Sequence, residues 1–190
     1  MTLHPGSCYT QAVIIKQLHC FPLVQKPFNY GGKMSITVKN QSGKVLAPGT
    51  GESFSMLGIT VTPKVVSQDT NGAYCLLEQQ VSPGSGSPPH IIHNADKVIY
   101  VVNGCFAVLL GQETVQAEAG ACVIIPRGVI HNFKNVGSEP GKILVSLNPA
   151  GHEDFLRDLS RVVQGGPPDP AKMVEVGQRH HVELLLNGKK

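Results

Sequence analysis

The chain has 190 residues, of which 41% are hydrophobic and 15% are charged, and its formal net charge is +3. This length suits one well-buried domain rather than two of ordinary size. The small, scattered positive charge does not favour a nucleic-acid surface, and no run reaches the roughly 18 apolar residues of a membrane span. No basic residue precedes the short apolar run at 12–15, which predicts a cytoplasmic protein without a secretory signal. The five cysteines include no C-x-x-C pair and are predicted to be reduced.

Residues 1–43 show no sustained periodicity and are interrupted by prolines. We interpret them as an N-terminal arm that packs on the domain or on a neighbouring subunit, or that is partly disordered. Within this arm, residues 34–38 have the composition of a strand. We expect a homodimer in which these residues add a strand to a sheet.

Residues 44–150 contain short apolar runs separated by turn-forming residues, which predicts an all-β sandwich or barrel. The expected strands lie within residues 54–66, 73–81, 96–102, 105–110, 113–119, 121–126, 131–136 and 142–147. The pair Asn103-Gly104 between two of these runs suits a type I′ turn, which predicts a hairpin at this point.

Residues 151–190 change to helical spacing. Phe155, Leu159 and Val162 recur along one face of a helix expected over residues 151–163. A Gly- and Pro-rich break follows, and then Asp169 is placed to cap a second helix that starts at Pro170. We expect both C-terminal helices to pack on the outside of the barrel.

Two groups of residues have the spacing of known sequence motifs. Between positions 84 and 104, Gly84, His90 and Gly104 resemble the first motif of the cupins. Residues 120–135, "GACVIIPRGVIHNFKN", resemble the second cupin motif. They match it at each of the motif's fixed positions, which fall on Gly120, Pro126, Gly128, His131 and Asn135. Over residues 44–186 the chain is similar to the single-domain cupins of the quercetin 2,3-dioxygenase type. The resemblance implies a double-stranded β-helix (jelly-roll barrel) with an internal cavity, commonly in a dimer.

In that family, two histidines and a glutamate of the first motif and one histidine of the second bind a divalent metal. Carried over by position, this set retains His90 and His131, whereas Ile92 and Lys97 occupy the other two ligand positions. A lysine ammonium opposes a divalent cation in a low-dielectric cavity. We therefore predict a degenerate metal site with no tightly bound metal and no other cofactor.

A metal-binding alternative requires a β-bulge. Successive side chains alternate between the faces of a strand, so His93 points outward unless one extra residue is inserted. With such a bulge, His93 and Asp96 would join His90 and His131 as ligands of iron, nickel, manganese or zinc. That arrangement would support a quercetinase-like, metal-dependent dioxygenase.

Our leading hypothesis is an enzyme of secondary metabolism in which Lys97, His90 and His131 are catalytic. A desolvated lysine has a lowered pKa, and histidines near neutrality can act as acid and base. This set suits isomerisation, dehydration or cyclisation without a metal. A third reading is a non-catalytic cupin that binds a small molecule, because a fold alone does not establish an activity.

The strand periodicity also predicts an apolar pocket around these three residues. Its expected substrate-binding residues are Ile92, Ile99, Val101, Phe106, Val108, Leu110 and Phe133. The substrate is expected to be apolar, either aromatic or polyketide-like, with a carbonyl or carboxylate for the lysine. The remaining histidines are predicted to be structural: His4, His19 and His152 are isolated, and His180 and His181 are expected to end a helix at the surface.

Overall fold

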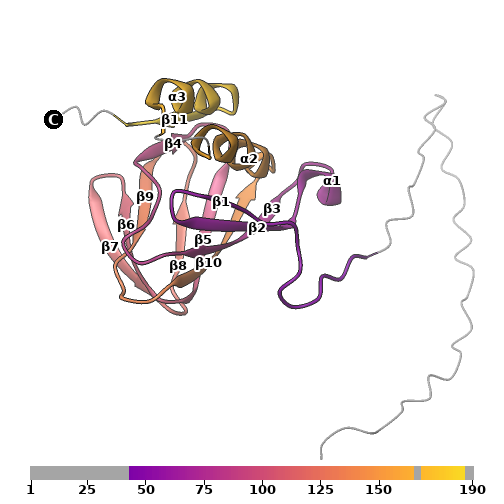
Figure 1. The fold of residues 1–190 in the computed structure, drawn as a ribbon, viewed down its shortest axis with the longest axis horizontal. Coiled ribbons are helices and arrows are strands. Elements are labelled where there is room, and N and C mark those ends of the chain that lie inside the picture. The colour runs from indigo at the N-terminus through magenta and orange to yellow at the C-terminus, as the bar shows by residue number, and fades with distance from the viewer. Residues whose placement is uncertain (1–42, 165–167, 187–190) are drawn as a thin grey trace, which may run out of the picture. The chain divides into compact units, whose positions relative to one another are not determined.

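A computed structural model of the protein describes residues 43–164 and 168–186, and two antiparallel β-sheets make up most of it (Figure 1). In spatial order, the larger sheet contains β1 (Phe54–Met56), β2 (Ile59–Val65), β3 (Cys75–Val81), β10 (Gly141–Asn148), β5 (Asp96–Asn103) and β8 (Cys122–Ile125). The smaller sheet contains β11 (Val182–Leu184), β4 (His90–Ile92), β9 (Ile130–Asn135), β6 (Cys105–Leu110) and β7 (Glu113–Glu118). The helices are α1 (Ser67–Thr70), α2 (His152–Val163) and α3 (Pro170–Arg179).

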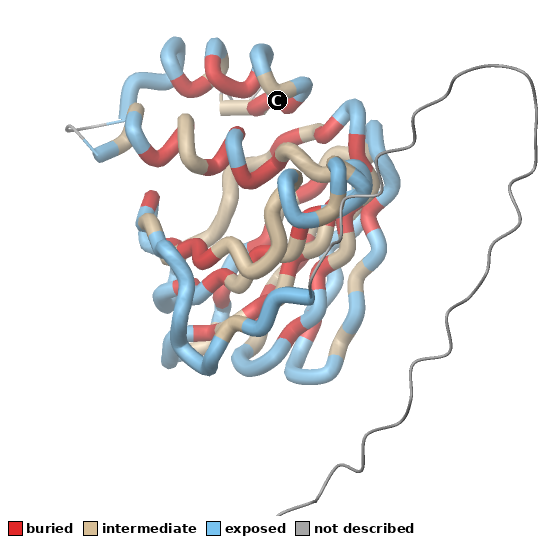
Figure 2. Tube along the Cα trace, turned by 90° about the vertical axis from the view of Figure 1, so that its right-hand side faces the viewer, coloured by how far each residue is buried: buried red, intermediate tan, exposed pale blue. Residues whose placement is uncertain are grey.

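One hydrophobic core fills the space between the two sheets. It arises because alternate residues of each strand point inward. In β10, for example, Ile143, Val145 and Leu147 are fully buried, while the residues between them are partly exposed. In β5 the buried residue Ile99 is followed by the exposed Tyr100, as the alternation predicted. Figure 2 shows this change between buried and exposed positions along the strands.

Helices α2 and α3 lie side by side over one end of the two sheets (Figures 1 and 2). The buried face of α2 includes Phe155, Leu156 and Leu159 and packs near β1 and β3, and α3 packs on β11. As predicted, Asp169 caps α3: its side chain accepts hydrogen bonds from the first-turn backbone, and Pro170 occupies the first helical position. No helix among the described residues is long and apolar enough to cross a membrane.

The predicted all-β barrel with two C-terminal helices is confirmed, but several local predictions are wrong. Asn103-Gly104 does not form a hairpin, because β5 belongs to the larger sheet and β6 to the smaller one. Gly104 alone separates these strands, at φ 94°, and a Cβ there would come within 2.8 Å of Gly141 Cα. The tight corner therefore transfers the chain from one sheet to the other.

Other differences concern short elements. The apolar run expected as one strand over residues 54–66 is divided into β1 and β2 by a turn at Leu57 and Gly58. Strand β11 and helix α1 were not predicted, and His181 lies in the turn before β11 rather than at the end of a helix. The strand predicted at 34–38, with the dimer contact based on it, lies outside the described residues.

Candidate active site

Three polar side chains from three strands meet inside the barrel. His90 of β4 and His131 of β9 are cross-strand partners in the smaller sheet, and their ring centroids lie 4.1 Å apart. Lys97 projects toward them from β5 in the larger sheet, with its Nζ 3.3 Å from His131 Nε2. The three side chains are only 4%, 1% and 3% exposed, respectively. The structure thus brings together the three residues that the sequence predicted to be catalytic.

Backbone carbonyl groups fix the orientation of both histidine rings. His90 Nδ1 lies 2.8 Å from the Pro88 carbonyl oxygen, and His131 Nδ1 lies 2.9 Å from that of Val129. A carbonyl oxygen only accepts hydrogen bonds, so each Nδ1 carries a proton. In a neutral ring the Nε2 atom then has a free lone pair, and the lone pair of His131 accepts a hydrogen bond from Lys97.

Burial determines the protonation states of this cluster. Desolvation lowers the pKa of Lys97 from 10.5 to about 7. Burial, together with the charge of Lys97, lowers the pKa of His131 to about 3, and the same two causes hold the pKa of His90 well below its ordinary value. At neutral pH both imidazoles are therefore uncharged, whereas the lysine is divided between amine and ammonium.

The surroundings of the cluster are apolar. Phe133 lies beside Lys97, with the centroid of its ring 5.7 Å from Nζ. Of the residues predicted to line the pocket, six are buried in the core, and the seventh, Leu110, is partly buried and packs against it. The buried six are Ile92, Ile99, Val101, Phe106, Val108 and Phe133. Their positions agree with the predicted inward faces, and their contact with a substrate stays a prediction.

The two additional metal ligands of the bulged alternative do not reach the cluster. His93 follows the end of β4, is exposed, and places its Nε2 3.1 Å from Glu183 Oε2. Asp96 is half-buried and forms an ion pair of 2.9 Å with Arg127. No group of three or more histidine, cysteine, aspartate or glutamate side chains with metal-binding geometry occurs in residues 43–164 and 168–186.

The donor set inside the barrel therefore does not fit a cupin metal. It offers two imidazole lone pairs and no carboxylate, and one of these lone pairs is already hydrogen-bonded to Lys97. Iron, nickel, manganese and zinc sites require more ligands than this, and a lysine ammonium repels a divalent cation.

His152, which the sequence gave no reason to select, also lies near the cluster. It is the first residue of α2, it is 9% exposed, and its ring packs 5.0 Å from that of Phe155. Burial and the nearby Lys97 and His131 hold its pKa well below the ordinary value. Its position follows from the structure, because α2 begins shortly after β10 and Leu147 of β10 pairs with Lys97.

The neighbouring residue, Glu153, holds the start of α2 in place. Its carboxylate accepts hydrogen bonds from the backbone N–H and hydroxyl of Ser67 and from the backbone N–H of Gly151. Burial alone would raise the pKa of Glu153, but these hydrogen bonds outweigh it and keep the pKa below its ordinary value. The carboxylate thus joins α2 to the segment after β2.

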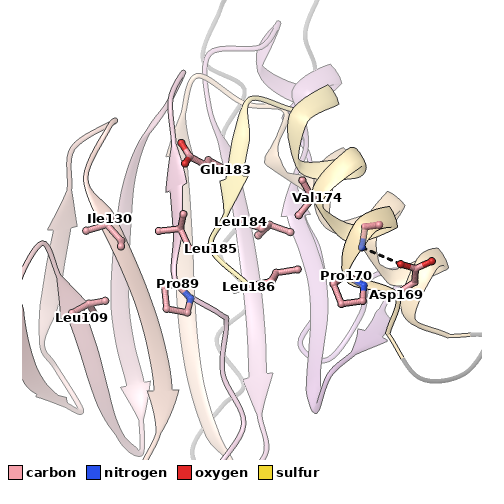
Figure 3. A pocket seen from close by; sticks show the side chains of 11 residues that line it. Pro89, Leu109, Ile130, Asp169, Pro170, Val174, Glu183, Leu184, Leu185 and Leu186 are labelled. Atoms are coloured by element: carbon pink, nitrogen blue, oxygen red, sulfur yellow. Dashed lines mark hydrogen bonds between the residues drawn. The ribbon is translucent and has the colours of Figure 1, made fainter. Parts of the chain in front are cut away.

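Two hollows lie beside the C-terminal helices. A groove of about 1000 Å³ runs between α3 and the outer face of the smaller sheet, lined by side chains such as Leu109, Ile130, Val174 and Leu184 (Figure 3). A smaller pocket of about 180 Å³ includes both Ile92 and His152 in its lining. Ile92 lies on the inner face of β4, two residues from His90, and His152 begins α2.

These features define a cupin fold: residues 77–147 match the family model of the cupin domain. In sequence, the chain is 40% identical over 57 residues to the uncharacterised protein SCO3923 of Streptomyces coelicolor, covering 30% of this chain and 53% of that protein. It is 25% identical over 92 residues to the tetracenomycin polyketide synthase protein TcmJ of Streptomyces glaucescens, covering 48% and 60%. The chain thus spans about half the length of the curated relatives it matches.

A solved structure supports the same fold. The polyketide cyclase RemF of Streptomyces resistomycificus superposes with a TM-score of 0.51 at 24% sequence identity, covering 56% of this chain and 80% of that one. At this identity the similarity establishes the architecture and leaves the chemistry to be argued from the residues.

Proposed function

We propose that the protein is an enzyme of secondary metabolism that acts on a polyketide or related aromatic substrate by metal-independent acid–base chemistry. The relatives support the substrate class, because TcmJ is named as a polyketide synthase protein and RemF as a polyketide cyclase. The observation that carries the proposal is the buried pair of Lys97 Nζ and His131 Nε2, 3.3 Å apart and without a carboxylate partner. This pair can hold and return a proton at neutral pH.

The amine form of Lys97 is the base in the proposed reaction. It donates one N–H to His131 Nε2, and its own lone pair accepts a proton from a carbon next to a substrate carbonyl. The electrons of the broken C–H bond move onto the carbonyl oxygen and give an enolate. The ammonium that forms remains hydrogen-bonded to His131.

The same proton completes a cyclisation. The enolate carbon attacks a second carbonyl group of the substrate, and the new alkoxide oxygen takes the proton from the Lys97 ammonium. Lys97 is then an amine again and can abstract a second proton from the carbon beside the new hydroxyl group. The C–O bond breaks, the C–H electrons form the new double bond, and the Lys97 ammonium gives its proton to the departing hydroxyl group, which leaves as water. His90 Nε2, directed into the barrel by the bond from its Nδ1 to Pro88, can accept a hydrogen bond from a substrate hydroxyl.

Turnover of aromatic polyketide intermediates, followed by mass spectrometry, tests this proposal. Lys97→Met is expected to lower kcat at least about 100-fold, the ordinary contribution of a positioned base. Lys134→Met removes an exposed lysine of β9 and is the matched control. In the wild type, kcat/KM should rise with pH through a midpoint near the Lys97 pKa of about 7. Turnover that survives in the Lys97 variant would refute the proposed role.

A further inference from the structure

A small pocket has Ile92, which lies on the same strand as His90 of the buried cluster, in its lining. Its volume is about 180 Å³, the space of about six water molecules at roughly 30 Å³ each. Its lining comes from three segments distant in the sequence: the end of β4, the start of α2 and the end of α3. Ile92 lies on the inner face of β4, two residues from His90, so this side of the pocket adjoins the catalytic residues.

His152 contributes a polar side chain to the lining of this pocket. It is nine-tenths buried, yet neither ring nitrogen has a hydrogen-bond partner among the described residues. A neutral imidazole there can donate one hydrogen bond to an oxygen atom in the pocket.

Arg179 gives the pocket a positive charge. It is the last residue of α3, it is exposed, and within residues 43–164 and 168–186 no carboxylate lies within ion-pair distance of its guanidinium group. The nearby carboxylate of Asp158 is already bound, at 2.8 Å by Arg161 and at 2.9 Å by His180. Asp154 also lines the pocket, but the guanidinium remains available to a ligand.

We propose that this pocket is the substrate entrance and that it binds a carboxylate of the substrate between Arg179 and His152. The proposal rests on the proposed function for the aromatic character of the ligand. A carboxylate is favoured because it matches a guanidinium fork and can also accept the His152 N–H. Bound there, it would direct the rest of the ligand past Ile92 toward Lys97.

Binding of 1-hydroxy-2-naphthoate to the full-length protein, measured by its fluorescence, tests the entrance. Arg179→Gln is expected to weaken binding about fivefold, the effect of losing one exposed charged contact. Lys172→Gln removes a positive charge from the same helix outside the pocket and should change the affinity less than about twofold. The uncharged 1-hydroxy-2-naphthamide should bind the wild type and the Arg179 variant equally.

Two further measurements make the outcome decisive. In nitrogen-15 spectra of histidine-labelled protein, the His152 ring signals should shift on addition of the naphthoate, and Lys97→Met should still bind it. Equal affinities of the Arg179 and Lys172 variants, or unchanged His152 signals, would overturn the proposed entrance. Intact binding by a protein that turns over no polyketide would instead contradict the proposed function and retain the entrance.

Discussion

Replacing Lys97 by methionine should make the folded protein more stable. The two side chains have similar length, and methionine fits the apolar surroundings that include Phe133 and Ile99. Lys97 has no carboxylate partner, and its hydrogen bond to His131 is the polar contact that the change removes. The substitution therefore exchanges a desolvated amine for an apolar group.

The expected gain follows from the change in the pKa of Lys97. Burial lowers this pKa from 10.5 to about 7, a change that corresponds to about 5 kcal/mol at about 1.4 kcal/mol per unit. Between these two values the unfolded chain binds more protons than the folded protein, so the free energy of unfolding rises with pH. The destabilisation is complete below the folded pKa and absent above the unfolded pKa. At pH 7 it amounts to about 4 kcal/mol, which sets the scale of the gain expected from methionine.

Urea unfolding between about pH 7 and pH 8.5 isolates this lysine. The lowered pKa values of His90 and His131 affect stability below pH 6.5, their ordinary pKa. The raised pKa of Cys75 affects stability above pH 9.0. Within this window the free energy of unfolding of the wild type should rise by about 1–2 kcal/mol, and that of Lys97→Met should stay level. An exposed-lysine control, Lys134→Met, should follow the wild type. A Lys97 variant that is less stable, or that keeps the wild-type slope, would refute a desolvated lysine.

Three other predictions follow from the structure. Wild-type protein dialysed against a chelator should contain far less than one transition metal ion per chain by elemental analysis. The double variant Ile92→His, Lys97→Glu should bind such an ion tightly. Stoichiometric metal in the wild type would contradict a degenerate metal site. Glu153→Gln should lower the free energy of unfolding by about 2–3 kcal/mol in urea, compared with less than about 0.5 kcal/mol for the exposed Glu183→Gln. A change from glycine to alanine ordinarily stabilises a helix by about 1 kcal/mol. In Gly177→Ala, however, the new methyl group would overlap a backbone carbonyl oxygen of β11, so Tm should fall. A rise in Tm would contradict the packing of α3 on β11.

Much of the fold could be predicted because strand alternation is a local property. The runs that became β3, β5, β6 and β10 lie close to their expected positions, and the cap at Asp169 agrees with its sequence signal. The corner at Gly104 could not be predicted from the same kind of evidence. Asn-Gly supplies the backbone freedom for either a hairpin or a change of sheet, and contact with Gly141, distant in the sequence, decides between them.

The site was predictable in part for a similar reason. Motif spacing selected His90, Lys97 and His131, and alternation correctly placed all three on inward faces. His152 and Arg179 belong to helices whose packing against the barrel no local pattern specifies. Their position beside Ile92 depends on the tertiary contacts of α2 and α3, which only the structure provides.

Lys97 presents the strongest argument that the barrel interior has a chemical role. A destabilisation of about 4–5 kcal/mol is comparable to the whole folding free energy of a small domain, and an apolar side chain of similar volume would avoid it. A lysine that served stability would instead have a carboxylate partner, and none reaches its Nζ among the described residues. Residues that destabilise the folded state in this way are usually kept because they take part in catalysis or binding. A Lys97→Met protein that is both more stable and inactive would therefore support catalysis, whereas one that is less stable would indicate a structural lysine.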